Sequence, residues 1–235
     1  MLIFLLDTSG PTAGVCLVED QILRYEAVVQ NKLTHSESIM PMVEEAYIRA
    51  GMDISQTDYF AAVTGPGSFT GVRIGVAALK GMAHAYGKPC TEVDALEAYA
   101  WGVRLFDGVI CPIRDARAGQ VYGAMFEGIS MERVMGDEPI QIEDFVRKAL
   151  AHAGGRKLLF VGDGAEPNRK AIEKMLGEQA FFAQADLNFL RPAAAGMLAV
   201  RDLSRAVSYL DFKPLYLRPP RADKQKNLLE KYVHV

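Results

Sequence analysis

Residues 2–30 of the chain, LIFLLDTSGPTAGVCLVEDQILRYEAVVQ, decide its fold. Large apolar and β-branched side chains fill residues 2–7, 14–19 and 22–30, and a Gly-Pro pair and a Glu-Asp-Gln run separate the three segments. Segments of this composition between turn signals are typical of β-strands. The stretch therefore predicts three consecutive strands that pair as a meander.

The rest of the first half alternates helices with strands. Apolar residues recur at helical spacing over residues 38–50, and the sequence then predicts a strand at 59–64, a tight loop, a helix at 72–86 and a strand at 89–93. The predicted order is β-β-β-α-β-α-β.

The second half repeats this order more loosely. It predicts strands at 109–114, 120–127, 131–134 and 157–161, and helices at 142–151, 167–176 and 192–207. Hairpins followed by strands that alternate with helices indicate an α/β fold with a mixed sheet in each of two lobes, flanked by helices. With the boundary between Arg104 and Gly108, we predict lobes at 1–106 and 107–235.

Composition excludes several classes of protein. A chain of 235 residues that is 50% hydrophobic buries a substantial core, and no apolar run approaches the roughly 18 residues of a membrane span. The three cysteines form no CxxC pair, which is typical of reduced thiols in a cytoplasmic protein.

Charge argues against a chain that wraps nucleic acid by itself, because the formal net charge is -3 and binding to phosphates needs a basic surface. Any contact with RNA is therefore expected to be indirect. Four basic residues near the C-terminus leave two readings open, a solvated tail or a contact with tRNA: Arg218, Arg221, Lys224 and Lys226.

Two short segments are candidates for nucleotide binding. Asp7, Thr8 and Ser9 end the first strand, where a carboxylate and two hydroxyls suit a magnesium phosphate, although an Asx turn explains them equally. The loop GPGSFTG, with Gly65 and Gly67, precedes a helix whose amides suit an anion. It lacks the lysine of a Walker A loop, so a tight strand-to-helix connection is the alternative.

No catalytic or metal-binding constellation stands out. The histidines at 35, 84, 152 and 234 form no HExxH pair, no serine lies in a GxSxG elbow, and no cysteine has a histidine beside it. The sequence therefore predicts no catalytic residue and no metal site.

The first-half helices are candidates for a protein interface. Only Arg73 and Lys80 are charged within residues 72–86, so this helix is expected to be covered on two sides, either inside its own lobe or by a partner. We predict an interface formed by eleven residues of the two helices: Ile39, Met42, Val43, Ala46, Gly71, Arg73, Ile74, Gly75, Ala78, Leu79 and Met82.

Several of these motifs together resemble a known family. They are LLDTSGPTAGVCLVED at the start, His35 before a helix, GPGSFTGVRIGVAALKGMA at 65–83, Asp-Ala-Arg at 115–117 and Pro-Leu-Tyr-Leu-Arg at 214–218. The chain is similar to the TsaB (YeaZ-like) family of the glycoprotease-like group, whose members serve the biosynthesis of threonylcarbamoyladenosine in tRNA. The resemblance covers most of the chain.

This resemblance implies a fold and a set of partners. The fold is that of actin-like ATPases (ribonuclease-H-like), in two lobes. The partners are a catalytic paralogue, TsaD, which transfers threonylcarbamoyl to tRNA adenosine, and an ATPase, TsaE; a homodimer is expected when the chain is alone. No cofactor of its own is implied, and ATP or ADP with Mg²⁺ would belong to the assembled complex.

Departures from the family pattern point to an accessory subunit. The catalytic paralogue binds metal through two histidines four residues apart, whereas here Ile39 stands four residues after His35. The motif that usually ends in glutamate ends here in Gln120. We therefore expect no enzyme activity from the chain alone. The alternative is a free-standing enzyme, either a small-molecule kinase of the same fold or a peptidase.

Overall fold

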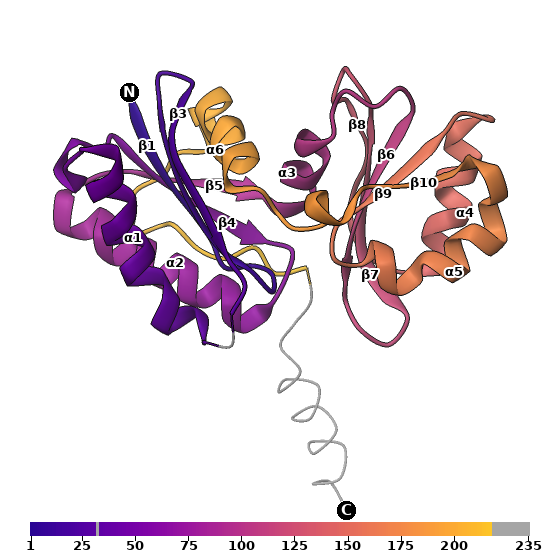
Figure 1. Ribbon diagram of the computed structural model, residues 1–235, viewed down its shortest axis with the longest axis horizontal. Helices are drawn as coiled ribbons and strands as arrows, with labels where there is room; N and C mark the ends of the chain where they lie inside the picture. The colour runs from indigo at the N-terminus through magenta and orange to yellow at the C-terminus, as the bar shows by residue number, and fades with distance from the viewer. Residues whose placement is uncertain (32, 218–235) are drawn as a thin grey trace, which may run out of the picture.

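Two five-stranded mixed sheets form the two lobes of the computed structural model, which describes residues 1–31 and 33–217 (Figure 1). The class predicted from the sequence, a mixed sheet flanked by helices in each lobe, is confirmed. The basic residues Arg218, Arg221, Lys224 and Lys226 lie outside the described residues.

The first sheet has the strand order β3-β2-β1-β4-β5. The meander predicted at the start of the chain is present as β1 (Leu2–Asp7), β2 (Ala13–Glu19) and β3 (Ile22–Val29), which pair antiparallel. β4 (Tyr59–Gly65) and β5 (Cys90–Asp94) add to β1 in parallel.

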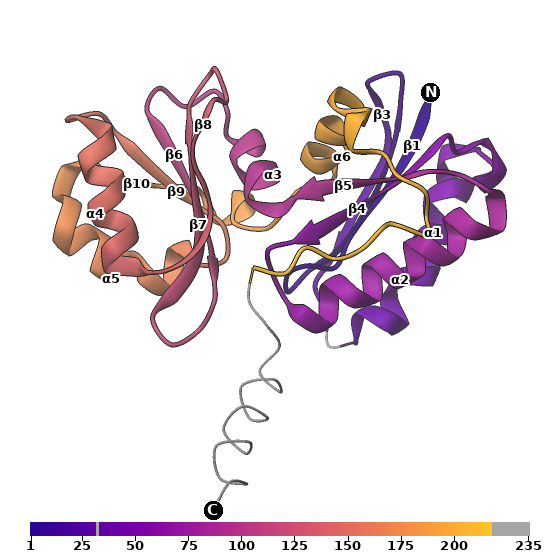
Figure 2. The same ribbon diagram turned by 180° about the vertical axis from the view of Figure 1, so that it is seen from behind.

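Two helices cover the outer face of this sheet, α1 (His35–Ala50) and α2 (Phe69–Tyr86) (Figure 2). Each begins three residues earlier than the apolar periodicity predicted, because capping residues set the start of a helix. The amide of Thr34 donates to Glu37 at 2.8 Å, and the hydroxyl of Ser68 accepts from the amide of Gly71 at 3.1 Å.

The second sheet repeats the arrangement of the first, with the strand order β10-β9-β6-β7-β8. Its antiparallel strands are β6 (Val109–Asp115), β7 (Gln120–Glu127) and β8 (Arg133–Gln141). β9 (Leu158–Val161) and β10 (Ala180–Phe182) follow in parallel. The helices α4 (Ile142–Ala153) and α5 (Ala165–Leu176) cover its outer face.

Two further helices lie between the sheets (Figure 1). α6 (Pro192–Arg201) packs against the first sheet and α3 (Ala95–Gly102) against the second, and the two helices contact each other. One apolar core extends from the first sheet through α6 and α3 to the second sheet. It includes Ile3 and Cys16 of the first sheet and Phe126 and Val161 of the second. The lobes are therefore joined by continuous apolar contact.

The end of the described chain returns to the first lobe. The backbone of Val207 pairs with Cys90 at the edge of the first sheet, and the amide of Leu215 donates to the carbonyl of Thr64 at 3.0 Å. Figure 2 shows this segment running alongside β4 and α2. The division into domains 1–106 and 107–235 stays a prediction, and α6 with the segment after it packs on the first of them.

Within residues 1–31 and 33–217, none of the helices combines the length and the apolar character that crossing a bilayer requires.

Candidate functional site

A cleft of about 840 Å³ opens between the two lobes. Its walls include the turn after β1, the GPGSFTG loop, the loop between β6 and β7, and residues 215–217. In this cleft the topology brings together the two segments that the sequence singled out. Ser9 and Gly67 line it, whereas Asp7, Thr8 and Gly65 lie behind its surface.

The floor of the cleft is the buried side chain of Arg114. A guanidinium has five N–H donors, and here all five are used. Nε donates to Asp163 Oδ2 at 3.3 Å, Nη1 donates to Ser9 Oγ at 2.8 Å and Pro66 O at 2.9 Å, and Nη2 donates to Ser9 O at 2.9 Å and Asp163 Oδ2 at 3.1 Å. The side chain therefore ties the second lobe to both loops of the first. We call it the Arg114 bridge.

The turn after β1 and the GPGSFTG loop both pack directly against this guanidinium. A Cβ atom on Gly10 or on Gly67 would lie 2.6 Å from an Arg114 nitrogen, so the backbone there fits only without a side chain. Two amides near the start of α2 are also engaged, because Ser68 N donates to Ser9 O at 2.8 Å and Gly71 N donates to Ser68 Oγ. Direct contacts between the protein's own groups thus join the turn after β1, the GPGSFTG loop and Arg114.

The carboxylate of Asp7 does not face the cleft. It is 1% exposed and accepts a hydrogen bond from the amide of Ser9 at 2.8 Å. Burial raises the pKa of Asp7, and the nearby charge of Arg114 opposes that rise. Thr8 is turned inward too, since its hydroxyl donates to the carbonyl of Gly71 at 2.7 Å. Asp7 and Thr8 thus shape the turn and hold α2.

The three cysteines are buried, and His35 contacts the backbone of a turn. Burial raises the pKa of all three cysteine thiols, that of Cys90 to about 11, so none is an activated thiolate. Nε2 of His35 lies 2.9 Å from the carbonyl of Gly10 and holds the β1–β2 turn. No group of three or more acidic, histidine or cysteine side chains is arranged to hold a metal among residues 1–31 and 33–217.

The mouth of the cleft is marked by a stack of two aromatic rings and a guanidinium. The Arg73 guanidinium lies 4.1 Å from the ring centre of Phe69, and its Nε donates to the hydroxyl of Tyr216 at 2.7 Å. The rings of Phe69 and Tyr216 are 5.0 Å apart. This stack fixes residues 215–217 against the first turn of α2.

Most of the predicted interface residues fill the lobe rather than its surface. Eight of the eleven are buried beneath α1 and α2: Ile39, Met42, Val43, Ala46, Gly71, Gly75, Leu79 and Met82. Only Arg73, Ile74 and Ala78 are accessible. Larger apolar side chains face the sheet because burying them there removes the most apolar surface from water.

The exposed side of the helices carries other residues. On α2 it presents Ala77, Gly81 and Ala85, and on α1 it presents Met40 at 52% and Ile48 at 68% exposure. A Cβ atom added to Gly81 would have no neighbour within 4 Å. We call this small-residue side of α2, with Met40 and Ile48 of α1, the helical face.

Comparisons with known proteins agree with this architecture. Residues 29–225 match the model of the TsaD family, described as tRNA N6-adenosine threonylcarbamoyltransferase. A protein of Bacillus subtilis (strain 168) named tRNA threonylcarbamoyladenosine biosynthesis protein TsaB is 32% identical over 95% of this chain and 96% of its own length. A tRNA N6-adenosine threonylcarbamoyltransferase of Erythrobacter litoralis is 40% identical, over 60% of this chain and 40% of its own.

A solved structure shares the fold. YeaZ from Pseudomonas aeruginosa has a TM-score of 0.77 at 23% identity, and the match covers 92% of this chain and 99% of that one. The two-lobed actin-like fold expected from the resemblance is therefore present.

Proposed function

Because the chain belongs to the TsaB family of tRNA threonylcarbamoyladenosine biosynthesis proteins, we propose that it is an accessory subunit that supports a catalytic partner and performs no transfer reaction alone. Its part in forming threonylcarbamoyladenosine follows from that membership. The names of the curated TsaB relatives favour neither a small-molecule kinase nor a peptidase.

The Arg114 bridge is the observation that carries the non-catalytic role. The turn after β1 and the GPGSFTG loop, which the sequence singles out as candidates for binding phosphate, here close on a fully hydrogen-bonded guanidinium. The lone His35, engaged with a backbone carbonyl, adds no metal site. ATP or ADP with Mg²⁺, where the reaction needs them, would then bind to other subunits or between subunits.

A TsaD-like transferase is the partner best supported by the comparisons, because the chain matches both the family model and individual transferases. The helical face is the surface we assign to it. Small outward residues on α2 let a partner helix approach closely, and Met40 and Ile48 add exposed apolar area on α1. When the transferase is absent, we expect the same face to pair two copies of this chain.

A TsaE-like ATPase and tRNA complete the proposed assembly, with tRNA bound through the transferase. We assign the protein to the cytoplasm, in keeping with a tRNA substrate and three free cysteines.

The first experiment asks whether the chain modifies tRNA alone. It is incubated with tRNA, threonine, bicarbonate, ATP and the enzyme that forms the threonylcarbamoyl adenylate, with and without the transferase. We expect modified adenosine only when the transferase is present. Modification by the chain and the adenylate-forming enzyme alone would refute the accessory role.

The second experiment tests the helical face with matched variants. Gly81→Arg places a large cation on α2, and Gly136→Arg places one on β8, where an added Cβ is equally free of neighbours. Both variants should fold. We expect Gly81→Arg to weaken binding to the transferase by more than tenfold and Gly136→Arg to leave it unchanged, as measured by calorimetry. Equal binding by both variants would assign the partner to another surface.

A further inference from the structure

A second surface with the character of a protein contact lies where the two lobes meet. It combines the end of α3, the turn between β7 and β8, and the end of α6. Leu105 is 83% exposed and Ile129 is 68% exposed, and the amide of Ile129 donates to the carbonyl of Arg104 at 2.6 Å. With Trp101 and Arg201, these residues make up what we call the junction surface.

The apolar tip of this surface is held in a strained conformation. Ile129 has a φ of 62°, a left-handed backbone that β-branched residues rarely adopt. The turn is fixed nonetheless, since Gly128 N donates to the carbonyl of Gly108 at 2.8 Å and Met131 N donates to that of Glu127 at 3.0 Å. An exposed isoleucine in such a turn contributes nothing to the core. Strain of this kind is concentrated at functional sites.

Two cations lie beside the apolar tip. The guanidiniums of Arg104 and Arg201 lie 4.5 and 4.4 Å from the ring centre of Trp101. Arg104 Nη1 donates to the carbonyl of Trp101, and neither side chain forms an ion pair with the part of the chain that the structure describes. Most of their donors remain free to bind carboxylates.

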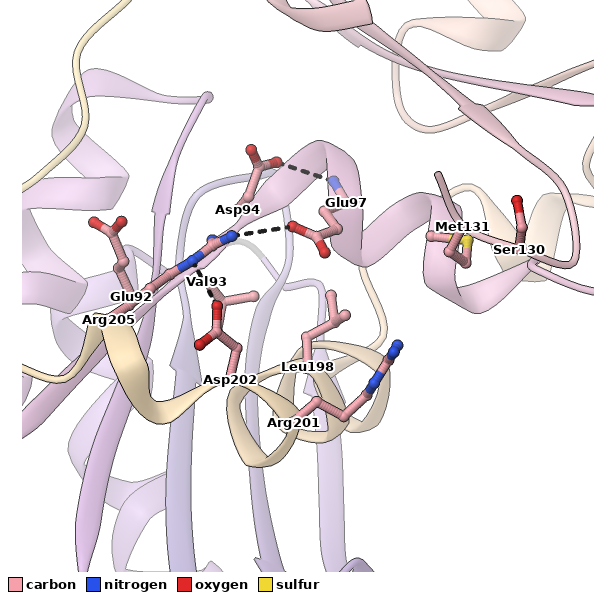
Figure 3. A pocket seen from close by; sticks show the side chains of 10 residues that line it. All are labelled: Glu92, Val93, Asp94, Glu97, Ser130, Met131, Leu198, Arg201, Asp202 and Arg205. Carbon is pink, nitrogen blue, oxygen red and sulfur yellow. Dashed lines mark hydrogen bonds and ion pairs between the residues drawn. The ribbon is translucent and has the colours of Figure 1, made fainter. Parts of the chain in front are cut away.

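A pocket of about 200 Å³ adjoins these residues (Figure 3). Met131 and Leu198 line it together with Arg201, and on its other side Arg205 pairs with Asp202 at 3.1 Å. The pocket can therefore accept an apolar side chain next to a free guanidinium.

These features favour a protein over a nucleic acid. Bases bind by stacking on open aromatic faces, but guanidiniums already lie over the Trp101 ring. Exposed side chains such as Leu105 and Ile129 offer apolar contact but no stacking surface for a base.

We propose that the junction surface binds a protein partner through a segment that presents apolar side chains together with carboxylates. The apolar side chains contact Leu105 and Ile129 and enter the pocket, and the carboxylates pair with Arg104 and Arg201. The junction surface and the helical face are formed by different helices and turns. The subunit could therefore bind one partner at each surface at the same time.

The first step of the test is site-specific cross-linking in cells. The photoreactive residue p-benzoylphenylalanine replaces Leu105 in the full chain, and it replaces Leu210, which is 73% exposed in the first lobe, as the matched control. Mass spectrometry then identifies the cross-linked peptide. We expect a peptide rich in acidic and apolar residues from position 105 only. The proposal would be overturned if position 105 cross-linked only to tRNA or only to a second copy of the chain. It would also be overturned if the yield of cross-linked peptide at position 105 did not exceed that at position 210.

The second step measures binding of that peptide, made synthetically, to purified variants. Arg201→Ser and Ile129→Asn should each weaken binding at least tenfold, and Lys174→Ser, which removes an exposed cation from α5, should not. Asparagine tolerates a positive φ, so Ile129→Asn should keep the melting temperature within about 2 °C of the wild type. Unchanged affinity in a folded Arg201→Ser or Ile129→Asn variant would also overturn the proposal.

Discussion

Arg114 and Asp163 form an ion pair of 3.1 Å beneath the cleft, in which the arginine side chain is 3% exposed and the aspartate side chain 23%. Removing the arginine takes the donors from Asp163 Oδ2 and Pro66 O and leaves the carbonyl of Ser9 with the amide of Ser68. We expect Arg114→Ala to lower the free energy of unfolding by about 3 kcal/mol, as measured by urea denaturation.

The variant Arg114→Lys separates the effect of the positive charge from that of the hydrogen-bond geometry. Arg114→Lys keeps the cation but cannot make five hydrogen bonds, so its loss of stability should lie between that of Arg114→Ala and zero. A loss below about 1 kcal/mol for Arg114→Ala would mean that the bridge does not hold the lobes together.

Stability should depend on pH through the carboxyl of Asp137. Burial raises its pKa to about 7, Asp94 adds to the rise, and Arg133 opposes it. In the unfolded chain the same carboxyl has a pKa near 3.9. Between about pH 4 and pH 7, Asp137 is therefore protonated in the folded state and ionised in the unfolded state. The contribution of protonated Asp137 to the free energy of unfolding is fully present below about pH 4, and it is lost as the pH rises through about 7.

Asp137→Asn tests this dependence, because the amide resembles the protonated acid. We expect the variant to lose less stability than the wild type between about pH 5 and pH 8, with a difference on the order of 1–2 kcal/mol in chemical denaturation. Asp211→Asn, at an exposed site, serves as the control. Identical pH profiles for wild type and Asp137→Asn would contradict the assignment.

Nucleotide should not bind tightly to the chain alone, because the Arg114 bridge fills the space between the phosphate loops. Calorimetry with ATP and Mg²⁺ should detect no complex tighter than about 1 µM, or roughly 8 kcal/mol. A submicromolar complex with the purified single protein would show that another part of the cleft binds nucleotide.

The cysteine thiols should report global unfolding. Cys16, Cys90 and Cys111 are all fully buried with raised pKa values, so an aromatic disulfide reagent should not label them in the native state at about pH 8. All three should react in concentrated guanidinium chloride. Rapid labelling of one thiol under native conditions would reveal local opening at that position.

The sequence was sufficient to predict the architecture but missed α3. Residues 95–100 are apolar almost all round, so they show no helical periodicity, and the helix is specified by Asp94, whose carboxylate accepts from Glu97 N at 2.9 Å. β8 was predicted at 131–134, whereas it runs to Gln141 through polar residues that sit at an edge of the second sheet.

The sequence allowed the loops of the candidate site to be predicted but not the arginine that joins them. Asp7 to Ser9 and the glycine loop were found because turn chemistry is local. Arg114 lies 105 residues from Ser9 and 49 from Asp163, so only the folded chain brings them together. The available signal was a charged residue at the end of the buried strand VICPIR.

The interface prediction stays untested, but eight of its eleven residues lie on the buried side of α1 and α2. α2 has small residues on every side and no clear polar face. The spacing of its apolar residues therefore does not indicate which side of the helix packs against the sheet. The larger residues, Leu79 and Met82 among them, are those that face inward.

The placement of α6 has a consequence for synthesis on the ribosome. The first sheet is made from residues 2–94, but the helix that covers its inner face begins only at Pro192. Until that helix has left the exit tunnel, side chains such as Cys16 and Val18 have no cover, although they lie fully buried in the finished protein. The nascent first sheet therefore waits for nearly the whole chain before its inner face is covered, and transiently exposed apolar surface of this kind is prone to aggregation.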